Sequence, residues 1–320
     1  MTTNLLWEPT EETIQNSNMQ AFSSRLAKKY SLANDCYDTI HKWSIENTAS
    51  FWEEVWSFCK IKSSSGFKEV VDDPKKMPGA NWFSGAKLNF AENLLQRRDN
   101  HKAIIFRGED TVKQEITYNE LYQKVKSLAA SFKKMGLKKG DRVAAFMPNM
   151  PETIIAMLAA SSIGAIWSST SPDFGIKGVL DRFSQIKPKF IIAADGYFYK
   201  GKAFDSLEKL KGILKSLPSV QNLILVDYTS SLKTDGIHNA ILFEDLLTPT
   251  NEELVFEQLD FSHPLYIMYS SGTTGLPKSI VHSAGGTLIQ HLKELKLHSN
   301  INSDQTVFYF TTCGWMMWNW

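Results

Sequence analysis

Strands and helices alternate along the chain from Asp141 onward, and no other feature constrains the fold as strongly. Short apolar segments alternate with segments of helical periodicity, and Pro151 suits the first turn of the helix that follows it. Strands that alternate with helices pair in parallel through right-handed crossovers. The sequence therefore predicts an α/β fold with parallel-type sheets flanked by helices. The predicted strands are 143–147, 165–168, 190–194, 222–227, 266–269 and 306–311, and the predicted helices are 152–163, 175–186, 206–216 and 286–298.

The first 95 residues have a different character, because they are rich in tryptophan and their helical patterning is interrupted by Pro and Gly. Phe51, Val55, Trp56 and Cys59 fall at helical spacing, which indicates a packed helix face rather than a functional one. We therefore divide the chain into a helical N-terminal cap segment, residues 1–95, and a second domain, residues 96–320.

A capping box marks the start of another helix near the beginning of the second domain. Thr117 precedes a segment of helical periodicity, and Glu120, three positions later, can bond back to the Thr117 backbone. This helix is expected to end at Gly136. A short strand at 103–106 is expected to open the domain.

Charge and composition exclude several classes of protein. Lys and Arg total 35 against 34 Asp and Glu, so no overall field favours nucleic acid or an anionic membrane. The three cysteines and the histidines lack the spacing of a disulfide framework or a zinc site, so we expect no metal site. The longest apolar stretch, 154–167, is too short to span a bilayer, and the N-terminus lacks the pattern of a signal peptide. We expect a cytoplasmic protein whose partners are small molecules rather than nucleic acid or membrane.

The stretch 266–279, YIMYSSGTTGLPKS, predicts a strand that ends in a phosphate-binding loop. Gly272 and Gly275 permit positive φ and close backbone approach, so successive N–H groups can converge on an anion. Ser and Thr hydroxyls and the ammonium of Lys278 add donors. The loop is not a Walker A motif, because the glycines are too close together and Pro277 precedes the lysine. A flexible surface loop is the alternative interpretation.

The run SSGTTGLPKSIVH resembles the signature loop of the AMP-forming acyl-CoA synthetases, within the adenylate-forming superfamily that also contains luciferases and peptide-synthetase adenylation domains. The resemblance implies the N-terminal part of the adenylate-forming fold and a ligase that uses ATP, Mg²⁺ and coenzyme A. It also implies that the loop holds the β- and γ-phosphates of ATP and then pyrophosphate. The resemblance assigns this role to Ser270, Ser271, Gly272, Thr273, Thr274, Gly275 and Lys278.

Two further stretches resemble the branch of this family that activates acetoacetate. LNFAENLL resembles the connection between the N-terminal cap and the adenylating core, and GWMMWNW stands where family members carry residues of the carboxylate pocket. The resemblance assigns Trp315, Met316 and Met317 to the acyl pocket, and a buried aromatic strand is the alternative interpretation. Met is adaptable and apolar, so it would shape a small pocket without supplying charge. Acetate or another short acid stays open as the substrate.

Two loops at predicted strand ends, SSTSPDFG and ADGYFYKGK, resemble segments that face coenzyme A in acetyl-CoA synthetases. Those enzymes bring two arginines to the phosphate of coenzyme A, and an ungapped match puts Tyr199 and Lys202 at these positions. Tyr199 departs from the family pattern, and Lys200 is the alternative cation. A solvated loop is an equally good interpretation of this stretch.

Family members continue through an acidic motif, a ribose-binding aspartate, a hinge and a small domain with a catalytic lysine, and none of these has a counterpart here. The catalytic residue is therefore unknown. We expect the chain to correspond to the N-terminal half of such an enzyme, as a fragment, a split-gene product or a truncation that needs a separate C-terminal half for activity. A non-catalytic nucleotide-binding subunit is the alternative from another class.

Overall fold

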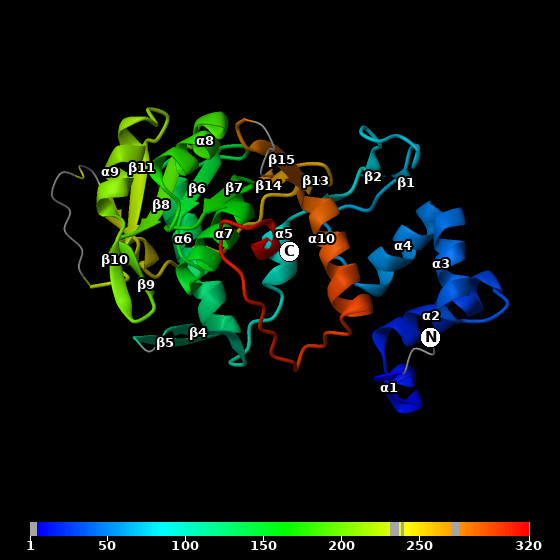
Figure 1. The fold of residues 1–320 in the computed structure, drawn as a ribbon. Helices are drawn as coiled ribbons and strands as arrows, with labels where there is room; N and C mark the ends of the chain where they lie inside the picture. Colours follow the sequence, from blue (N-terminus) through cyan, green and yellow to red (C-terminus); the bar gives the residue numbers. More distant parts are fainter. Residues whose placement is uncertain (1–4, 110, 231–236, 238–239, 271–274, 320) are drawn as a thin grey trace. The chain divides into compact units, whose positions relative to one another are not determined.

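The computed structural model describes residues 5–109, 111–230, 237, 240–270 and 275–319. The chain divides into two compact units, a smaller one of residues 1–86 with 286–308 and a larger one of residues 87–285 with 309–320. Figure 1 traces the chain through both, with the N-terminal helices in blue and the central sheet mainly in green. Each unit has its own buried side chains, such as Phe22 in the smaller unit and Trp167 in the larger.

The smaller unit is mainly helical. Its predicted packed helix face is confirmed, since Val55 and Cys59 are buried and the Phe51 ring lies edge-on to Phe22 with centroids 6.0 Å apart. The elements of this unit are α1 (Glu11–Gln15), α2 (Asn18–Tyr30), α3 (Tyr37–Glu46) and α4 (Thr48–Phe58), an antiparallel pair of β1 (Glu69–Val71) and β2 (Trp82–Ser84), and most of α10 (Ala284–Lys293) with the π-helical turn Glu294–His298 that follows it.

A sheet of seven strands organises the described part of the larger unit, in the order β12-β11-β8-β6-β7-β14-β15. Each neighbouring pair from β12 to β14 is parallel, and β15 adds an antiparallel edge. The predicted α/β architecture is confirmed, because intervening helices return the chain between parallel neighbours. The strands are β6 (Arg142–Phe146), β7 (Ile166–Thr170), β8 (Phe190–Ala194), β11 (Asn222–Val226), β12 (Ala240–Leu242), β14 (Pro264–Ser270) and β15 (Lys278–Ser283).

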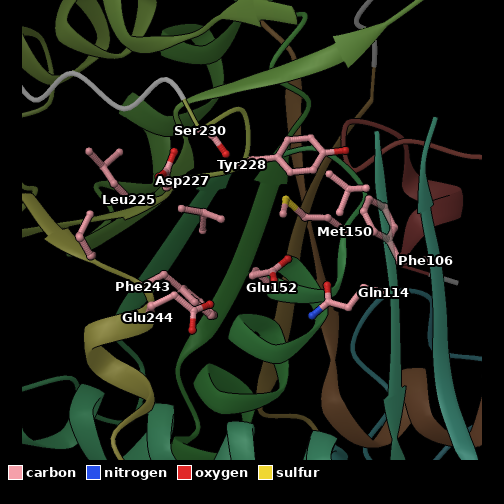
Figure 2. A pocket seen from close by; sticks show the side chains of 13 residues that line it. Phe106, Gln114, Met150, Glu152, Leu225, Asp227, Tyr228, Ser230, Phe243 and Glu244 are labelled. Carbon is pink, nitrogen blue, oxygen red and sulfur yellow. The ribbon is translucent and has the colours of Figure 1, made fainter. Parts of the chain in front are cut away.

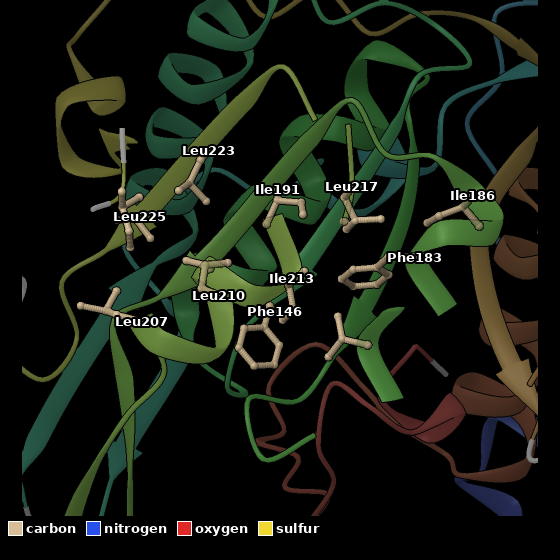
Figure 3. Close-up of a cluster of buried hydrophobic side chains, with 14 of the residues drawn as sticks. Phe146, Phe183, Ile186, Ile191, Leu207, Leu210, Ile213, Leu217, Leu223 and Leu225 are labelled. Atoms are coloured by element: carbon tan, nitrogen blue, oxygen red, sulfur yellow. The ribbon is translucent and has the colours of Figure 1, made fainter. Parts of the chain in front are cut away.

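Helices cover both faces of this sheet, because successive residues of a strand point to opposite faces. In β8, the Phe190 ring meets Phe132 of α6 edge-on, with centroids 5.7 Å apart. The next residue, Ile191, belongs instead to a buried cluster with Phe183 of α8 and Leu210 of α9, drawn in Figure 3. The helices of the larger unit are α5 (Phe90–Leu94), α6 (Tyr118–Lys134), α7 (Pro151–Ile163), α8 (Ile176–Ile186) and α9 (Leu207–Lys215).

The two helix starts that the sequence marks with Thr117 and Pro151 in this unit are confirmed. The Glu120 N–H donates to Thr117 Oγ1 (3.2 Å), and the Thr117 N–H donates back to the Glu120 carboxylate (2.7 Å), which completes the capping box. Pro151 occupies the first turn of α7, and Gly164 ends that helix with a φ of 81°, a conformation that favours glycine. Helix α7 is almost entirely buried, yet neither it nor any other described helix is long and apolar enough to cross a membrane.

Three antiparallel strand pairs among the described residues of the larger unit were not predicted, although the strand expected at 103–106 is confirmed within β4 (Lys102–Gly108). In a hairpin, backbone pairing is decided by the turn and by cross-strand contacts, which short mixed segments signal weakly. The pairs are β4 (Lys102–Gly108) with β5 (Val112–Thr117), β9 (Gly196–Tyr199) with β10 (Lys202–Asp205), and β3 (Lys87–Leu88) with β13 (Leu259–Asp260).

The prediction of a strand at 306–311 is wrong. The described residues of this stretch form no strand, and its apolar side chains lie in solvent, with Phe308 86% and Phe310 81% exposed. An apolar run becomes a strand only where a neighbour accepts its backbone hydrogen bonds. Among the described strands none pairs with this stretch.

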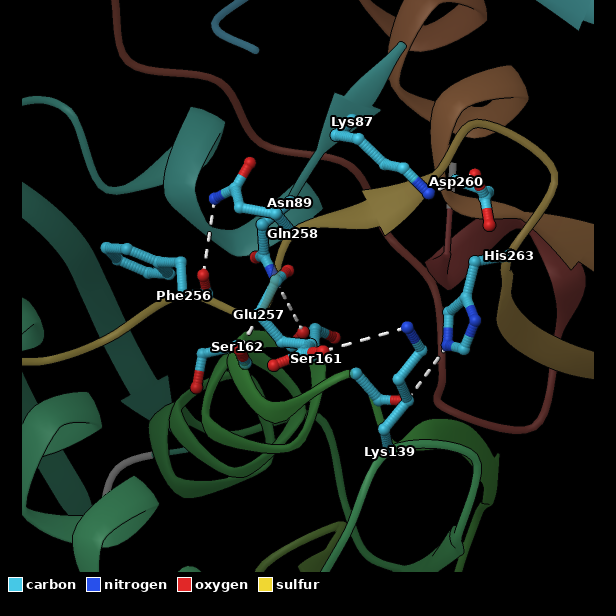
Figure 4. A network of polar contacts seen from close by, with 11 residues as sticks. Lys87, Asn89, Lys139, Ser161, Ser162, Phe256, Glu257, Gln258, Asp260 and His263 are labelled. Atoms are coloured by element: carbon cyan, nitrogen blue, oxygen red, sulfur yellow. Dashed lines mark hydrogen bonds and ion pairs between the residues drawn. The ribbon is translucent and has the colours of Figure 1, made fainter. Parts of the chain in front are cut away.

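A buried asparagine ties the segment LNFAENLL to the core of the larger unit (Figure 4). Asn89 is fully buried and caps α5, with its Oδ1 accepting from the Glu92 N–H at 3.2 Å. Its amide nitrogen donates to the main-chain oxygens of Ser161 (3.0 Å), Ser162 (3.2 Å) and Glu257 (2.9 Å). The segment therefore anchors the end of α7 and the connection before β13 through one side chain.

Candidate active site

The carboxyl ends of the parallel strands open into a cavity of about 680 Å³, which we call the carboxyl-edge cavity. Ligands of open α/β sheets bind at this edge, where the loops after the strands diverge. The cavity is lined by loop residues that follow β6, β7, β8 and β11 and by the hairpin β4–β5. These residues include Pro148, Asn149, Ser171, Asp173, Tyr197, Tyr199, Tyr228 and Glu109.

The turn between β9 and β10 carries the three residues that the sequence assigned to coenzyme A. Tyr199 pairs with Lys202 across the hairpin, and the Lys200 ammonium lies over the Tyr199 ring at 5.2 Å from its centroid. The Glu109 carboxylate accepts from the Lys200 and Gly201 N–H groups, each at 2.7 Å, and so holds the turn. Tyr199 lines the carboxyl-edge cavity, whereas Lys200 and Lys202 are exposed and do not line it.

Asp195, directly after β8, organises the loop that follows β11. Its buried carboxylate accepts from the Tyr228 N–H (2.8 Å), the Thr229 N–H (3.0 Å) and the Thr229 hydroxyl (2.6 Å). The next residue, Gly196, has no room for a side chain, because a Cβ there would stand 2.4 Å from the main-chain oxygen of Phe204. Sequence reasoning missed Asp195, although an acidic residue at the carboxyl end of a predicted strand was a usable signal.

The flanks of the glycine-rich loop form the antiparallel edge of the sheet, whereas Ser271, Gly272, Thr273 and Thr274 lie outside the described residues. Ser270 at the end of β14 is in register with Lys278 at the start of β15. Gly275 has a φ of 114°, so the positive φ expected of this glycine is confirmed. Lys278 is exposed.

Gln185 of α8 holds the second flank of this loop, and sequence reasoning missed it. Its amide nitrogen donates to the main-chain oxygen of Pro277 at 2.9 Å, and its carbonyl oxygen accepts from the Ser279 hydroxyl at 3.0 Å. The side chain therefore bonds to the residues on both sides of Lys278. No sequence signal identifies these contacts, because Pro277 and Ser279 lie 92 and 94 residues from Gln185 along the chain.

A partly buried tyrosine, Tyr269, joins β14 to β7 and α8. The Tyr269 hydroxyl donates to the main-chain oxygen of Arg182 at 3.3 Å and lies 3.2 Å from the Ser168 hydroxyl. The Arg182 guanidinium stands 4.8 Å from the centroid of Phe174 and 5.7 Å from that of Tyr269. Burial raises the pKa of Tyr269 to about 12, so the hydroxyl stays protonated and serves as a donor.

Of the three residues assigned to the acyl pocket, two line a common cavity. Trp315 and Met316 border a space of about 10 Å³ beside β7 and β14, whereas Met317 does not line it and is 43% exposed. This volume corresponds to about one water molecule. Two contacts hold the chain beside this cavity: a Cβ on Gly314 would stand only 3.0 Å from the Phe174 ring, and the Ser169 hydroxyl donates to the Cys313 carbonyl at 2.9 Å.

The described residues hold no group of three His, Cys, Asp or Glu side chains arranged for a metal ion. Burial lowers the pKa of His282 and of His298, which favours their neutral forms.

A family model described as "AMP-binding enzyme" matches residues 90–319. The chain belongs to this family. A second model, described as the N-terminus of acetyl-coenzyme A synthetase, matches residues 37–94. The glycine-rich loop, the carboxyl-edge cavity and the 313–319 segment all lie within the AMP-binding match.

Relatives in the AMP-binding enzyme family are similar to the chain along its whole length. Acetoacetyl-CoA synthetase from Gallus gallus is 47% identical, over 100% of the chain and 49% of its own length. Malonamoyl-CoA synthetase from Penicillium aethiopicum is 36% identical, over 99% of the chain and 46% of its own length. The solved structure of acetoacetyl-CoA synthetase from Streptomyces lividans matches with a TM-score of 0.94 and 36% identity, over 99% of the chain and 49% of that structure. The chain spans about half the length of the relatives it matches.

Proposed function

We propose that the chain forms the N-terminal half of an AMP-forming acid–thiol ligase that activates acetoacetate. The carboxylate of the acid attacks the α-phosphorus of ATP, pyrophosphate leaves, and the thiol of coenzyme A then displaces AMP from the acyl-adenylate. The single observation that carries this proposal is the AMP-binding match over residues 90–319, which includes the β14–β15 hairpin. The similarity to acetoacetyl-CoA synthetases supports the choice of acid.

In this proposal the loop between β14 and β15 binds the β- and γ-phosphates of ATP and then pyrophosphate. Ser270 and Lys278 face each other across the hairpin, so hydroxyl and ammonium donors flank the site from both strands. Mg²⁺ enters with the nucleotide and shares the neutralisation of phosphate charge. Positioning and charge neutralisation supply most of the rate in such transfers.

Trp315, Met316 and Met317 border the acid in the proposed enzyme, and Tyr199, Lys200 and Lys202 approach coenzyme A. The carboxyl-edge cavity supports the second assignment, because Tyr199 lines it and its volume suits part of a large cofactor. The acyl cavity must widen beyond its volume of about 10 Å³ to admit the acid. The exposed side chains of Trp315 and Met317 allow that rearrangement without loss of a packed core.

The proposed enzyme is cytoplasmic, with residues 1–95 as a cap segment and 96–320 as an incomplete AMP-binding domain. In this proposal the ribose contact and the catalytic lysine belong to the half of the relatives' length that the chain does not span. The chain alone therefore has little ligase activity. Carboxylate-dependent exchange of pyrophosphate into ATP by the purified chain alone would contradict this division of roles.

A chimera that joins the chain to the C-terminal half of the Streptomyces lividans enzyme tests the substrate. We expect pyrophosphate exchange to be fastest with acetoacetate, with malonamate second, because both acids carry a carbonyl at the same distance from the carboxylate. Acetate and butyrate lack that carbonyl and should be slower. Faster exchange with acetate than with acetoacetate would assign the chain to the acetyl-CoA branch. A chimera that is inert with all four acids, while the chain still binds pyrophosphate, would support a non-catalytic nucleotide-binding subunit.

The contact between Gln185 and the loop gives a second prediction. Replacing Gln185 by alanine removes the bonds to Pro277 and Ser279, so the strand that presents Lys278 loses its support from α8. We expect the KM for ATP in the chimera to rise about tenfold, the effect of roughly 1.4 kcal/mol. The exposed Gln123 is a matched control, and Gln123→Ala should leave KM unchanged. Equal KM values for the two variants would show that Gln185 plays no part in phosphate binding.

A further inference from the structure

A second cavity of about 400 Å³, which we call the acidic cavity, lies in the larger unit between β5, the start of α7 and the ends of β11 and β12 (Figure 2). Its lining holds the carboxylates Glu152, Asp227 and Glu244, and among the described residues that border it there is no Lys, Arg or His. The proposed ligase chemistry uses none of these three acids. An uncompensated acidic lining predicts a positively charged occupant.

Glu152 is the buried member of this set, only 9% exposed, in the first turn of α7. Its Oε2 has no hydrogen-bond partner among the described residues. Burial raises the pKa of Glu152, and the charge of Glu244 acts in the same direction, while its own N–H and Lys124 oppose them. A buried acceptor without a donor costs free energy, which a ligand that supplies the donor recovers.

Aromatic and apolar side chains form the rest of the wall. The rings of Phe106 and Tyr228 stand with centroids 6.3 Å apart at an interplanar angle of 53°, and Met150 and Phe243 are buried beside them. Ring faces attract organic cations. Burial, together with the charges of Glu152 and Glu109, raises the pKa of Tyr228 to about 12, so its ring stays neutral.

A metal ion fits this lining poorly. Hard cations need several oxygen ligands at one point, and no three carboxylates of the described residues converge in that way. A single buried acceptor within an apolar, aromatic enclosure instead suits one ammonium group on an apolar body. The volume of about 400 Å³ lies within the range of small-molecule sites.

We propose that the acidic cavity binds a small organic ammonium ion whose nitrogen donates to Glu152 Oε2 and whose apolar body lies against Phe106, Tyr228 and Met150. Asp227 and Glu244, both exposed, attract the cation at the entrance. Phe106 and Tyr228 also line the carboxyl-edge cavity. The occupant therefore touches a wall that the two cavities share, and it does so independently of the proposed ligase activity.

Calorimetric titration of the purified chain with three matched probes tests the proposal at neutral pH. Benzylamine, benzyl alcohol and benzoate have similar size and shape and differ in charge. We expect one benzylamine per chain, at least tenfold weaker binding of benzyl alcohol, and no binding of benzoate. Benzylamine binding no tighter than that of benzyl alcohol, or absent, overturns the proposal.

The variant Glu152→Gln separates a direct contact from general attraction. It should lower benzylamine affinity at least tenfold and leave benzyl alcohol unchanged, because the amide keeps the shape and loses the charge. Glu244→Gln should have a smaller effect, and Glu208→Gln, whose carboxylate is 80% exposed on α9 outside the cavity, should have none. Unchanged benzylamine affinity in Glu152→Gln contradicts the assignment.

The stability of Glu152→Gln shows that the variant folds and checks the environment of the carboxyl. A carboxyl whose pKa is raised by folding destabilises the protein only when it is ionised. The melting temperature of Glu152→Gln should therefore match that of the parent chain below the ordinary pKa of 4.5. As pH rises above 4.5, the melting temperature of Glu152→Gln should exceed that of the parent chain by a growing margin. A variant less stable than the parent at neutral pH would show that the ionised carboxylate is already well partnered without a ligand, which contradicts the proposal.

Discussion

Replacing Lys278 by alanine is expected to slow pyrophosphate exchange in the chimera about a hundredfold, with most of the loss in kcat. Lys278 begins β15, opposite Ser270, so its ammonium leaves the sheet edge directly beside the loop. In the proposed reaction, negative charge on the pyrophosphate leaving group grows in the transition state. A fixed cation at that point is worth more there than in the ground state.

Steady-state exchange kinetics with ATP and acetoacetate would measure this effect. Lys278→Arg keeps the charge and should recover part of the rate, whereas Lys215→Ala, an exposed lysine at the end of α9, should behave as the parent. A loss confined to KM would indicate that Lys278 binds substrate and transition state equally. Parent-like kinetics in Lys278→Ala would remove the lysine from the phosphate site.

Replacing Asn89 by alanine is expected to lower the free energy of unfolding of the chain by about 2–4 kcal/mol. The substitution removes the cap of α5 and the amide donor to the partly buried main-chain oxygen of Glu257, whereas the main-chain oxygens of Ser161 and Ser162 keep bonds from the Gly164 and Glu257 N–H groups. Each buried acceptor without a partner costs about 1–3 kcal/mol, and a lost helix cap costs about 1 kcal/mol. Such a loss is a large share of the about 5–15 kcal/mol that stabilises a typical domain.

Urea titration followed by circular dichroism would measure this loss. Gln96→Ala is the matched control, because the Gln96 amide is exposed and its bond goes to the nearby Asn93 carbonyl at 3.2 Å. That variant should stay within about 0.5 kcal/mol of the parent. An Asn89→Ala chain as stable as Gln96→Ala would show that water replaces the amide, and the segment LNFAENLL would then lose its role as an anchor.

Asp195 and Tyr228 connect the two cavities of the larger unit. The Asp195 carboxylate holds the main chain at Tyr228 and Thr229, and the Tyr228 ring lines both the carboxyl-edge cavity and the acidic cavity. An occupant of either cavity therefore contacts a side chain whose backbone is fixed after β8. Neither residue stood out in the sequence, because their relation depends on the pairing of β8 with β11.

The elements that the sequence predicted best are those specified by local chemistry. The strand 190–194 matches β8 residue for residue, and Thr117, Glu120 and Pro151 mark helix starts that the structure confirms. Caps and N-terminal prolines act within a single turn, so neighbouring residues suffice to specify them. The prediction of a strand at 306–311 failed because a strand forms only beside a paired strand, and that pairing is not specified by neighbouring residues.

By itself, the sequence determined the alternation of strands and helices, the helix caps, the family through SSGTTGLPKSIVH, and the residues to test at the loop. Only the tertiary structure decided that β15 is antiparallel, that Gln185 bonds beside Lys278, and that Glu152 faces an acidic cavity without a partner. The physical reason is the separation along the chain between the residues that interact. Periodicity and capping act between residues a few positions apart. The unpartnered carboxylate of Glu152 and the bonds of Gln185 beside Lys278 arise only after distant segments have packed together.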